Sequence, residues 1–155
     1  MCRIIGFDAI VHKNDKVLIL GSMPSVKSLQ EQMYYANPNN RFWPMLQAIY
    51  HMPIETNEQK KQILEKNHIA LWDICHSCIR PGSLDSHIKE IVPNDIVSLL
   101  KENPSIERII CNGKTSYKLL KKHFDLDAIS CPSTSSANAS MRLDDLVKIY
   151  KEVLK

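Results

Sequence analysis

The sequence predicts an α/β fold that is built on a parallel β-sheet. Apolar runs of strand length alternate along the chain with segments of helical period, which is typical of βαβ units. The runs are apolar throughout, as expected for strands in a sheet that is covered on both faces. The 155 residues are 44% hydrophobic and 24% charged, and no repeat or linker divides them, so we expect one domain over residues 1–155.

The predicted strands are short and contain β-branched residues. They are residues 16–20, 69–74, 106–111 and 128–131. Ligands of parallel α/β sheets are expected just beyond the carboxyl ends of the strands. The residues that follow each strand are therefore the first candidates for a functional site.

Segments of helical period separate these strands. The predicted helices are residues 41–50, 58–66, 95–102, 114–124 and 143–154. In the last of them, apolar residues recur at helical spacing and form one stripe. Asn57 and Asn94 are placed as N-caps, and Pro104 ends the helix before it.

The turn after the first predicted strand reads Gly21-Ser22-Met23-Pro24-Ser25. A glycine at this point allows a tight turn, in which successive N–H groups can point at an acceptor. The turn lacks the second glycine and the Lys-Ser/Thr pair of a nucleotide phosphate loop, and also the spacing of a dinucleotide fingerprint. Taken alone, it is a plain connection from strand to helix.

Residues 34–43 are unusually rich in aromatic and amide side chains. They include two adjacent tyrosines, three asparagines and a Phe-Trp pair, in a chain that is only 6% aromatic. Aromatic rings offer faces for a planar base, and asparagine amides offer both a donor and an acceptor. We expect Phe42 and Trp43 to begin the next helix and to pack into the core.

A resemblance to a known family rests on these segments and on those that follow the later strands. The matching segments are GSMPSVKSLQEQMYYANPNNRFW, LWDI, RPGSLD, CNG and PSTSSANA. Together they resemble the hypoxanthine-DNA (deoxyinosine) glycosylase branch of the uracil-DNA glycosylase superfamily. The resemblance covers nearly the whole chain and implies a three-layer α/β/α sandwich around a four-stranded parallel sheet, which acts on a nucleotide flipped out of DNA.

The resemblance also implies where the catalytic amide lies. In the related mismatch-specific uracil and thymine glycosylases, the first motif resembles Gly-x-Asn-Pro-Gly, and its Asn positions the hydrolytic water. Here that position is Met23, whose thioether is no strong acceptor for a water proton. Similarity to the hypoxanthine branch implies that Asn40 takes over this role, and the neighbouring Asn39 is the alternative.

We expect different groups of the site to act on the sugar and on the base that leaves it. An amide has no useful pKa for general base catalysis, so we expect Asn40 to hold water in line and to present its carbonyl dipole to the sugar. The N–H groups of Gly21, Ser22 and Met23 are the expected donors to the departing base. Tyr35 stands at the position of the family's stacking aromatic and is expected to cover the face of that base.

The segment after the last predicted strand is polar but carries no acid. It holds Ser133, Thr134, Ser135, Ser136 and Asn138. Small hydroxyl and amide groups next to a helix N-terminus suit phosphate contact, and the resemblance implies that this loop enters the DNA. We expect Arg142 to add positive potential, with Lys114 and Arg80 as further candidates. Without the resemblance, an ordinary polar loop with capping serines is the simpler interpretation.

Other possible sites are weaker. Cys75-His76-Ser77-Cys78 is only half of a zinc pattern, because Cys111 and Cys131 stand alone, so we expect no metal and no cofactor. We expect Asp73 to anchor a loop, and Ser83 and Asp85 to act as loop or cap residues.

Composition limits the partners and the compartment. The formal charge is only +3, so charge alone does not predict nucleic-acid binding. Five irregularly spaced cysteines and the lack of an apolar run that spans a bilayer predict a reduced, cytoplasmic protein that does not enter a membrane. We expect it to be a monomer.

Two functions remain open at this point, with DNA as the expected partner. The first is a monofunctional DNA glycosylase that acts on hypoxanthine, or next on uracil. The alternative is a non-catalytic α/β module that binds a nucleotide or damaged nucleic acid, and a hydrolase that uses Cys or Ser is a distant third.

Overall fold

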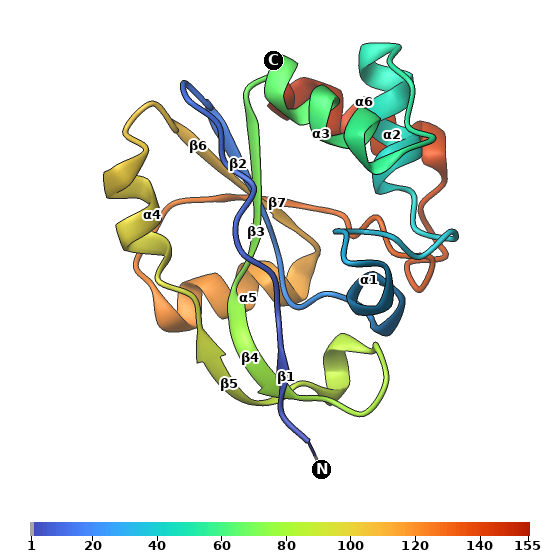
Figure 1. Cartoon of the computed structure of the whole chain (residues 1–155). Coiled ribbons are helices and arrows are strands. Elements are labelled where there is room, and N and C mark those ends of the chain that lie inside the picture. The colour runs from blue at the N-terminus through green and yellow to red at the C-terminus, as the bar shows by residue number, and fades with distance from the viewer. Residues whose placement is uncertain (1) are drawn as a thin grey trace.

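The computed structural model, which describes residues 2–155, is organised around a four-stranded parallel sheet with the order β3-β2-β6-β7 (Figure 1). The strands are β2 (Val17–Gly21), β3 (Ile69–Asp73), β6 (Arg108–Asn112) and β7 (Ile129–Cys131). Every residue of the central strand β2 is buried. The register pairs Gly21 with Asp73 and Asn112 with Cys131, so the carboxyl ends of all four strands meet at one edge.

Helices cover both faces of this sheet (Figure 1). On one face lie α2 (Phe42–Tyr50), α3 (Asn57–Lys66) and α6 (Leu143–Leu154). On the other face lie α4 (Ile96–Glu102) and α5 (Lys114–His123). Successive side chains of β2 serve the two layers, because Ile19 packs in the first core and Leu18 and Leu20 pack in the second. The expected three-layer α/β/α sandwich is confirmed.

The predicted elements begin and end within two residues of the observed ones, but both predicted N-caps are wrong. The cap of α3 is Thr56, whose hydroxyl accepts from the N–H of Gln59 while the Gln59 side chain accepts from the N–H of Thr56, so this pair forms a capping box. Asn57 is instead the first residue of the helix.

Asn94 does not cap α4 because its side chain is used elsewhere. It is buried, and its amide donates to the main-chain carbonyls of Asp73 and Cys75 at 2.8 and 3.2 Å. Asp95 caps the helix by accepting from the N–H of Ser98 at 3.1 Å.

A small antiparallel sheet with the order β1-β4-β5 was not predicted. Its strands are β1 (Ile4–Ile5), β4 (Cys75–Ile79) and β5 (Lys89–Pro93), and it is accompanied by the short helices α1 (Val26–Glu31) and η1 (Asp85–His87). Only Ile74 separates β3 from β4, so the predicted strand 69–74 covers β3 and β4 was missed. Within residues 2–155, no helix is long and apolar enough to cross a bilayer.

Candidate active site

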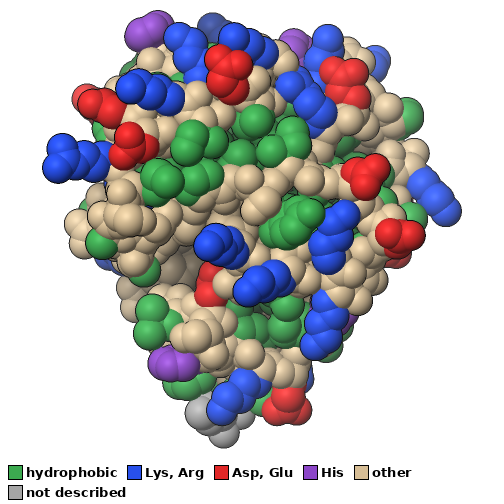
Figure 2. Space-filling model, turned by 180° about the vertical axis from the view of Figure 1, so that it is seen from behind, with side chains coloured by type: hydrophobic (Ala, Val, Ile, Leu, Met, Phe, Trp, Pro, Cys, Tyr) green, Lys and Arg blue, Asp and Glu red, His purple; other side chains and the backbone are tan. Residues whose placement is uncertain are grey.

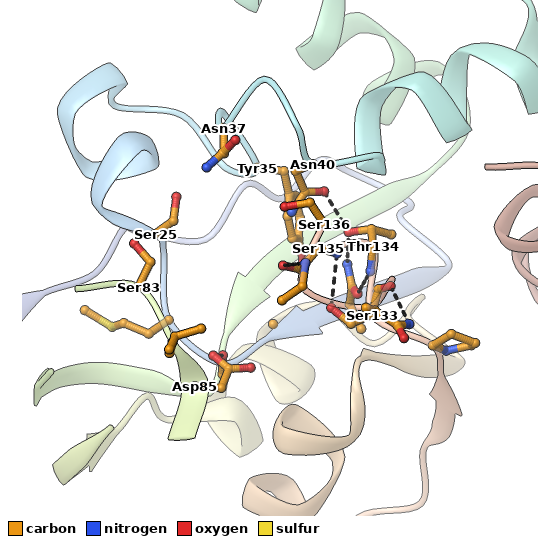
Figure 3. Close-up of a pocket in the computed structure, with 18 of the residues that line it drawn as sticks. Ser25, Tyr35, Asn37, Asn40, Ser83, Asp85, Ser133, Thr134, Ser135 and Ser136 are labelled. Atoms are coloured by element: carbon orange, nitrogen blue, oxygen red, sulfur yellow. Dashed lines mark hydrogen bonds between the residues drawn. The ribbon is translucent and has the colours of Figure 1, made fainter. Parts of the chain in front are cut away.

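A cavity of about 860 Å³ opens at the carboxyl edge of the parallel sheet. Its lining includes the last residues of all four strands, namely Gly21, Asp73, Asn112 and Cys131. Figure 3 shows Asn40 and the segment Ser133–Ser136 on one side of this pocket, with Ser25, Ser83 and Asp85 on the other. The predicted location at the strand ends is therefore the place where the pocket forms.

Asn40 is held in one orientation by a chain of hydrogen bonds (Figure 3). Its Oδ1 accepts from the hydroxyl of Thr134 at 2.8 Å and from the N–H of Phe42 at 2.9 Å. Thr134 is bound in turn to Asn112, which accepts from the Thr134 N–H at 3.0 Å and donates to its Oγ1 at 3.1 Å. The chain joins the end of β6, the loop after β7 and the start of α2.

The structure separates the two neighbouring asparagines. Asn40 is half-buried and lines the pocket, whereas Asn39 is exposed and does not belong to the lining. Phe42 and Trp43 begin α2 and are buried in the core, as expected.

Tyr35 lies at the pocket with its ring held from one side. The ring stacks on Phe42 with centroids 4.0 Å apart and an interplanar angle of 25°. Its backbone is in the left-handed region, with φ at 54°. The hydroxyl is buried and has no hydrogen-bond partner among the described residues, and its burial, reinforced by the charge of Asp73, raises the pKa of Tyr35.

The turn that follows β2 is held by main-chain and side-chain bonds. The carbonyls of Gly21 and Ser22 accept from the N–H groups of Ile74 and Cys75 at 2.9 and 3.0 Å. The hydroxyl of Ser22 donates to Asp85 at 2.6 Å. The side chain of Met23 is buried in a small apolar cluster, so the part of this turn that remains for a ligand is mainly its backbone.

Asp73 and Asp85 both line the pocket, although neither was predicted as part of the site. Asp73 is only 4% exposed, and its Oδ2 has no hydrogen-bond partner among the described residues. Burial, with the nearby charge of Asp85 as the second cause, raises the pKa of Asp73 to about 7. The position of Asp73 at the carboxyl end of a parallel strand was the signal that could have found it.

The loop after β7 is anchored by Arg41, whose role was not predicted. Its guanidinium donates to the carbonyl oxygens of Ser135 at 2.7 Å, of Asn138 at 3.2 Å and of Thr134 at 3.3 Å, and also to that of Met141. One side chain therefore fixes the path of residues 134–141. Nothing in the local sequence indicates these contacts, because the loop lies more than 90 residues away.

The predicted phosphate-binding residues differ in exposure. Thr134 is fully buried, while Ser136 is exposed. Ser133, Ser135 and Asn138 are half-buried and partly bonded within the loop, since Ser133 Oγ accepts from the Ser135 N–H at 3.1 Å and Asn138 Nδ2 donates to the Ser133 carbonyl at 3.1 Å. Arg142 is exposed at the start of α6 and lies outside the pocket lining.

Replacing Arg41 by Met is expected to loosen this loop. A hydrogen bond from a charged donor contributes roughly 1.5 to 3 kcal/mol, so losing several of them should speed amide hydrogen exchange in residues 133–141 by at least about tenfold. Arg142→Met is the matched control, because it removes the same charge beside the loop without those carbonyl contacts. Unchanged exchange in Arg41→Met would show that the loop holds its shape without this anchor.

Comparison with known proteins identifies the family. Residues 8–154 match the uracil DNA glycosylase superfamily. The chain belongs to this superfamily. Proteins named hypoxanthine DNA glycosylase from Methanosarcina acetivorans and Methanosarcina barkeri are 35% and 31% identical to it, and each match covers 86% of this chain and 87% of the relative.

The superfamily fold is matched by a solved structure as well. The solution NMR structure of a protein from Methanosarcina acetivorans, described as a candidate uracil DNA glycosylase, superposes with a TM-score of 0.83. The two chains are 31% identical, and the match covers 99% of this chain and 97% of the other. The resemblance expected from the sequence motifs is confirmed.

The basic side chains that were expected to add positive potential lie in different surroundings. Arg80 is only 5% exposed and donates to the carbonyls of Pro24 at 2.6 Å and Gly82 at 2.7 Å, so it braces the turn instead of lying on the surface. Lys114 is exposed and lines the pocket. On the face seen in Figure 2, Lys and Arg side chains are scattered with acidic side chains among them.

The cysteines of this superfamily member are free thiols. Cys75 and Cys78 lie on β4 and pack with Met23. Among residues 2–155, no three His, Cys, Asp or Glu side chains are grouped to hold a metal ion. Burial raises the pKa of Cys75 to about 12 and that of Cys111 to about 11, which disfavours the thiolate that a cysteine nucleophile requires.

Proposed function

We propose that this protein is a monofunctional DNA glycosylase, carried by one domain, that hydrolyses the N-glycosidic bond of a flipped deaminated base. Hypoxanthine is the leading substrate and uracil the second. The observation that supports this function most strongly is the fixed Asn40 amide, which lines the same pocket as the backbone turn Gly21–Met23 and Tyr35. The names of the two Methanosarcina relatives favour hypoxanthine.

At the sugar, the bonding of Asn40 refines its proposed role. Oδ1 already accepts two hydrogen bonds, so the Nδ2 amine is the group that remains to hold water. A water that accepts from Nδ2 keeps a second lone pair for attack on the anomeric carbon. Because Thr134 and Phe42 hold the carbonyl, the expectation that this carbonyl faces the sugar is wrong, and the proposed role of Asn40 is to hold the water.

At the base, the backbone of the turn and the ring of Tyr35 act together. N–H groups of Ser22 and Met23 stabilise negative charge on the departing base, and a preorganised donor of this kind contributes roughly 3 kcal/mol. The Gly21 N–H bonds to the Asp73 carboxyl, so Gly21 contributes by holding that side chain at the base. One face of the Tyr35 ring is taken by Phe42, which leaves the other for the flipped base.

On the DNA strand, we assign phosphate contacts to the loop after β7. Ser136 and Arg142 are exposed for direct contact, and Ser133, Ser135 and Asn138 supply further polar groups. Thr134 is buried and acts instead by positioning Asn40. Hydroxyl and amide contacts of this type need little net charge, in keeping with a formal charge of +3.

The deciding experiment uses labelled oligonucleotides that hold a single inosine, uracil or xanthine, followed by alkaline cleavage of abasic sites. Excision of inosine is the expected result. No abasic product from any of them would favour the alternative, a non-catalytic nucleotide or damaged-nucleic-acid binding module. We propose a cytoplasmic monomer without metal or cofactor, so activity should survive EDTA, and borohydride should trap no protein–DNA adduct.

Replacement of Tyr35 tests the stacking role. Tyr35→Phe should retain most of the excision rate, because it keeps the ring and removes a buried hydroxyl that has no partner. Tyr35→Ala should lower the rate roughly 10-fold to 100-fold, since stacking on a base contributes roughly 1 to 3 kcal/mol. Single-turnover excision of inosine measures both variants. Equal losses in the two would assign the function to the hydroxyl.

A further inference from the structure

A buried carboxyl oxygen at the pocket, Oδ2 of Asp73, has no hydrogen-bond partner among the described residues. The hydroxyl of Tyr35 lies beside it and is within reach of the Asn112 side chain. Asp73 and Tyr35 both line the pocket, and both flank Gly21, where an added Cβ would lie 2.5 Å from Asp73 Oδ1 and 3.2 Å from the Tyr35 hydroxyl. Buried polar groups are nearly always paired, so an unpaired carboxyl oxygen at the wall of a substrate pocket indicates a partner supplied by the ligand.

The surroundings of Asp73 favour its neutral form. Burial and the negative charge of Asp85, which also lines the pocket, raise the pKa of Asp73, while Arg80 and a hydrogen bond from the Gly21 N–H partly oppose this shift. Burial leaves the nearby Tyr34, Tyr35 and Cys75 protonated, with the pKa of each raised. Asp73 forms no ion pair among residues 2–155, so no cation compensates fully for a charge on this carboxyl.

We propose that Asp73 reads the flipped base as a neutral carboxylic acid, whose carbonyl oxygen accepts from a ring N–H and whose hydroxyl donates to the adjacent ring carbonyl. This inference rests on the proposed glycosylase function. A carboxylic acid carries one donor and one acceptor side by side, as an asparagine amide does. It therefore forms two hydrogen bonds with any base edge that presents N–H next to C=O.

That edge is common to both proposed substrates, and guanine and thymine present it too, so their exclusion rests on other groups of the pocket. Hypoxanthine presents N1–H beside C6=O, and uracil presents N3–H beside C4=O, so one side chain serves both. An ionised Asp73 would still accept from the ring N–H, but it would face the ring carbonyl with a negative charge. The hydrogen bond from the neutral acid to that carbonyl grows stronger as negative charge develops on the leaving base, so it assists the reaction as well as recognition.

The test is the pH dependence of single-turnover excision of inosine from duplex DNA, between about pH 5.5 and pH 9, in wild type and Asp73→Asn. Because the pKa of Asp73 lies near 7, the wild-type rate should fall about tenfold for each pH unit above that value. The Asn variant presents its donor and acceptor at every pH. The ratio of its rate to that of wild type should therefore rise about tenfold for each unit above pH 7.

Two further variants sharpen the result. Asp73→Ala loses both groups and should be slower than Asp73→Asn at every pH. Asp85→Asn leaves Asp73 in place but removes the charge that helps to raise its pKa, so the fall in rate should begin at a lower pH than in wild type. This variant keeps the proposal testable if substitution of the buried Asp73 impairs folding.

The outcomes separate this inference from the proposed function. No abasic product from wild type at any pH would contradict the glycosylase function itself. Active wild type with the same pH profile in Asp73→Asn would overturn only the role of Asp73. A wild-type rate that rises with pH, together with an inactive Asn variant, would also overturn it, because the ionised acid would then be the working form.

Discussion

Asn40→Ala is expected to slow excision of inosine by about two to three orders of magnitude, the loss typical of removing one preorganised transition-state donor. The change removes the Nδ2 amine that is proposed to hold the water, together with the carbonyl that fixes its orientation through Thr134 and Phe42. It leaves Ser136 and Arg142, the exposed groups assigned to the DNA strand, in place. Single-turnover kinetics should therefore fall far more than affinity for inosine-containing DNA, measured by fluorescence anisotropy.

Two matched variants separate chemistry from structure at this position. Asn39→Ala alters an exposed neighbour outside the pocket and should behave as wild type. Thr134→Val removes the hydroxyl that donates to Asn40 but keeps the amide, so its loss should be intermediate. A wild-type excision rate in Asn40→Ala would remove this residue from the mechanism.

Gly21→Ala is expected to abolish most excision through a steric effect at the pocket. An added Cβ would lie 2.5 Å from Asp73 Oδ1, closer than real contacts allow, and 3.2 Å from the Tyr35 hydroxyl, which is a tight contact. Asp73 must move and Tyr35 must shift slightly, and with them the surface that meets the base. We expect a loss of at least about 100-fold in the single-turnover rate and a decrease of roughly 1 to 3 kcal/mol in the free energy of unfolding.

Gly82→Ala is the control for this substitution. Its Cβ would meet nothing within 4 Å, but its φ of 79° strains any residue with a side chain. It should decrease the free energy of unfolding by roughly 1 to 2 kcal/mol and leave excision near the wild-type rate. Similar rates in the two Ala variants would refute a steric origin for the effect at Gly21.

The sequence predicted the parallel sheet and its helices because their signals are local. Continuous apolar runs and helical periodicity are readable within a few residues, as in β2 and α6. The antiparallel sheet has no such signal, because β4 continues directly from β3 and β5 is exposed and ends in Pro93.

The same difference between local and long-range signals explains which residues of the candidate site were predicted. Gly21, Tyr35 and Asn40 were found because they occupy a contiguous motif after a strand. The anchoring of the loop by Arg41 and the burial of Thr134 depend on contacts across more than 90 residues, and no local pattern encodes them. The unpaired oxygen of Asp73 depends on what surrounds it in space, so the sequence indicated only its position.

The buried carboxyl of Asp73 is also expected to lower the free energy of unfolding at neutral pH. Its pKa is about 7 in the folded protein against about 4 for an ordinary aspartate, so the folded chain binds the proton more tightly than the unfolded chain. The free energy of unfolding therefore decreases as pH rises from about 4 to about 7, and stays lower above that range. An amide at this position would avoid the penalty but would lose the response to protons. If Asp73 contacts the base as proposed, a bound base that pairs with the neutral acid would restore part of that stability.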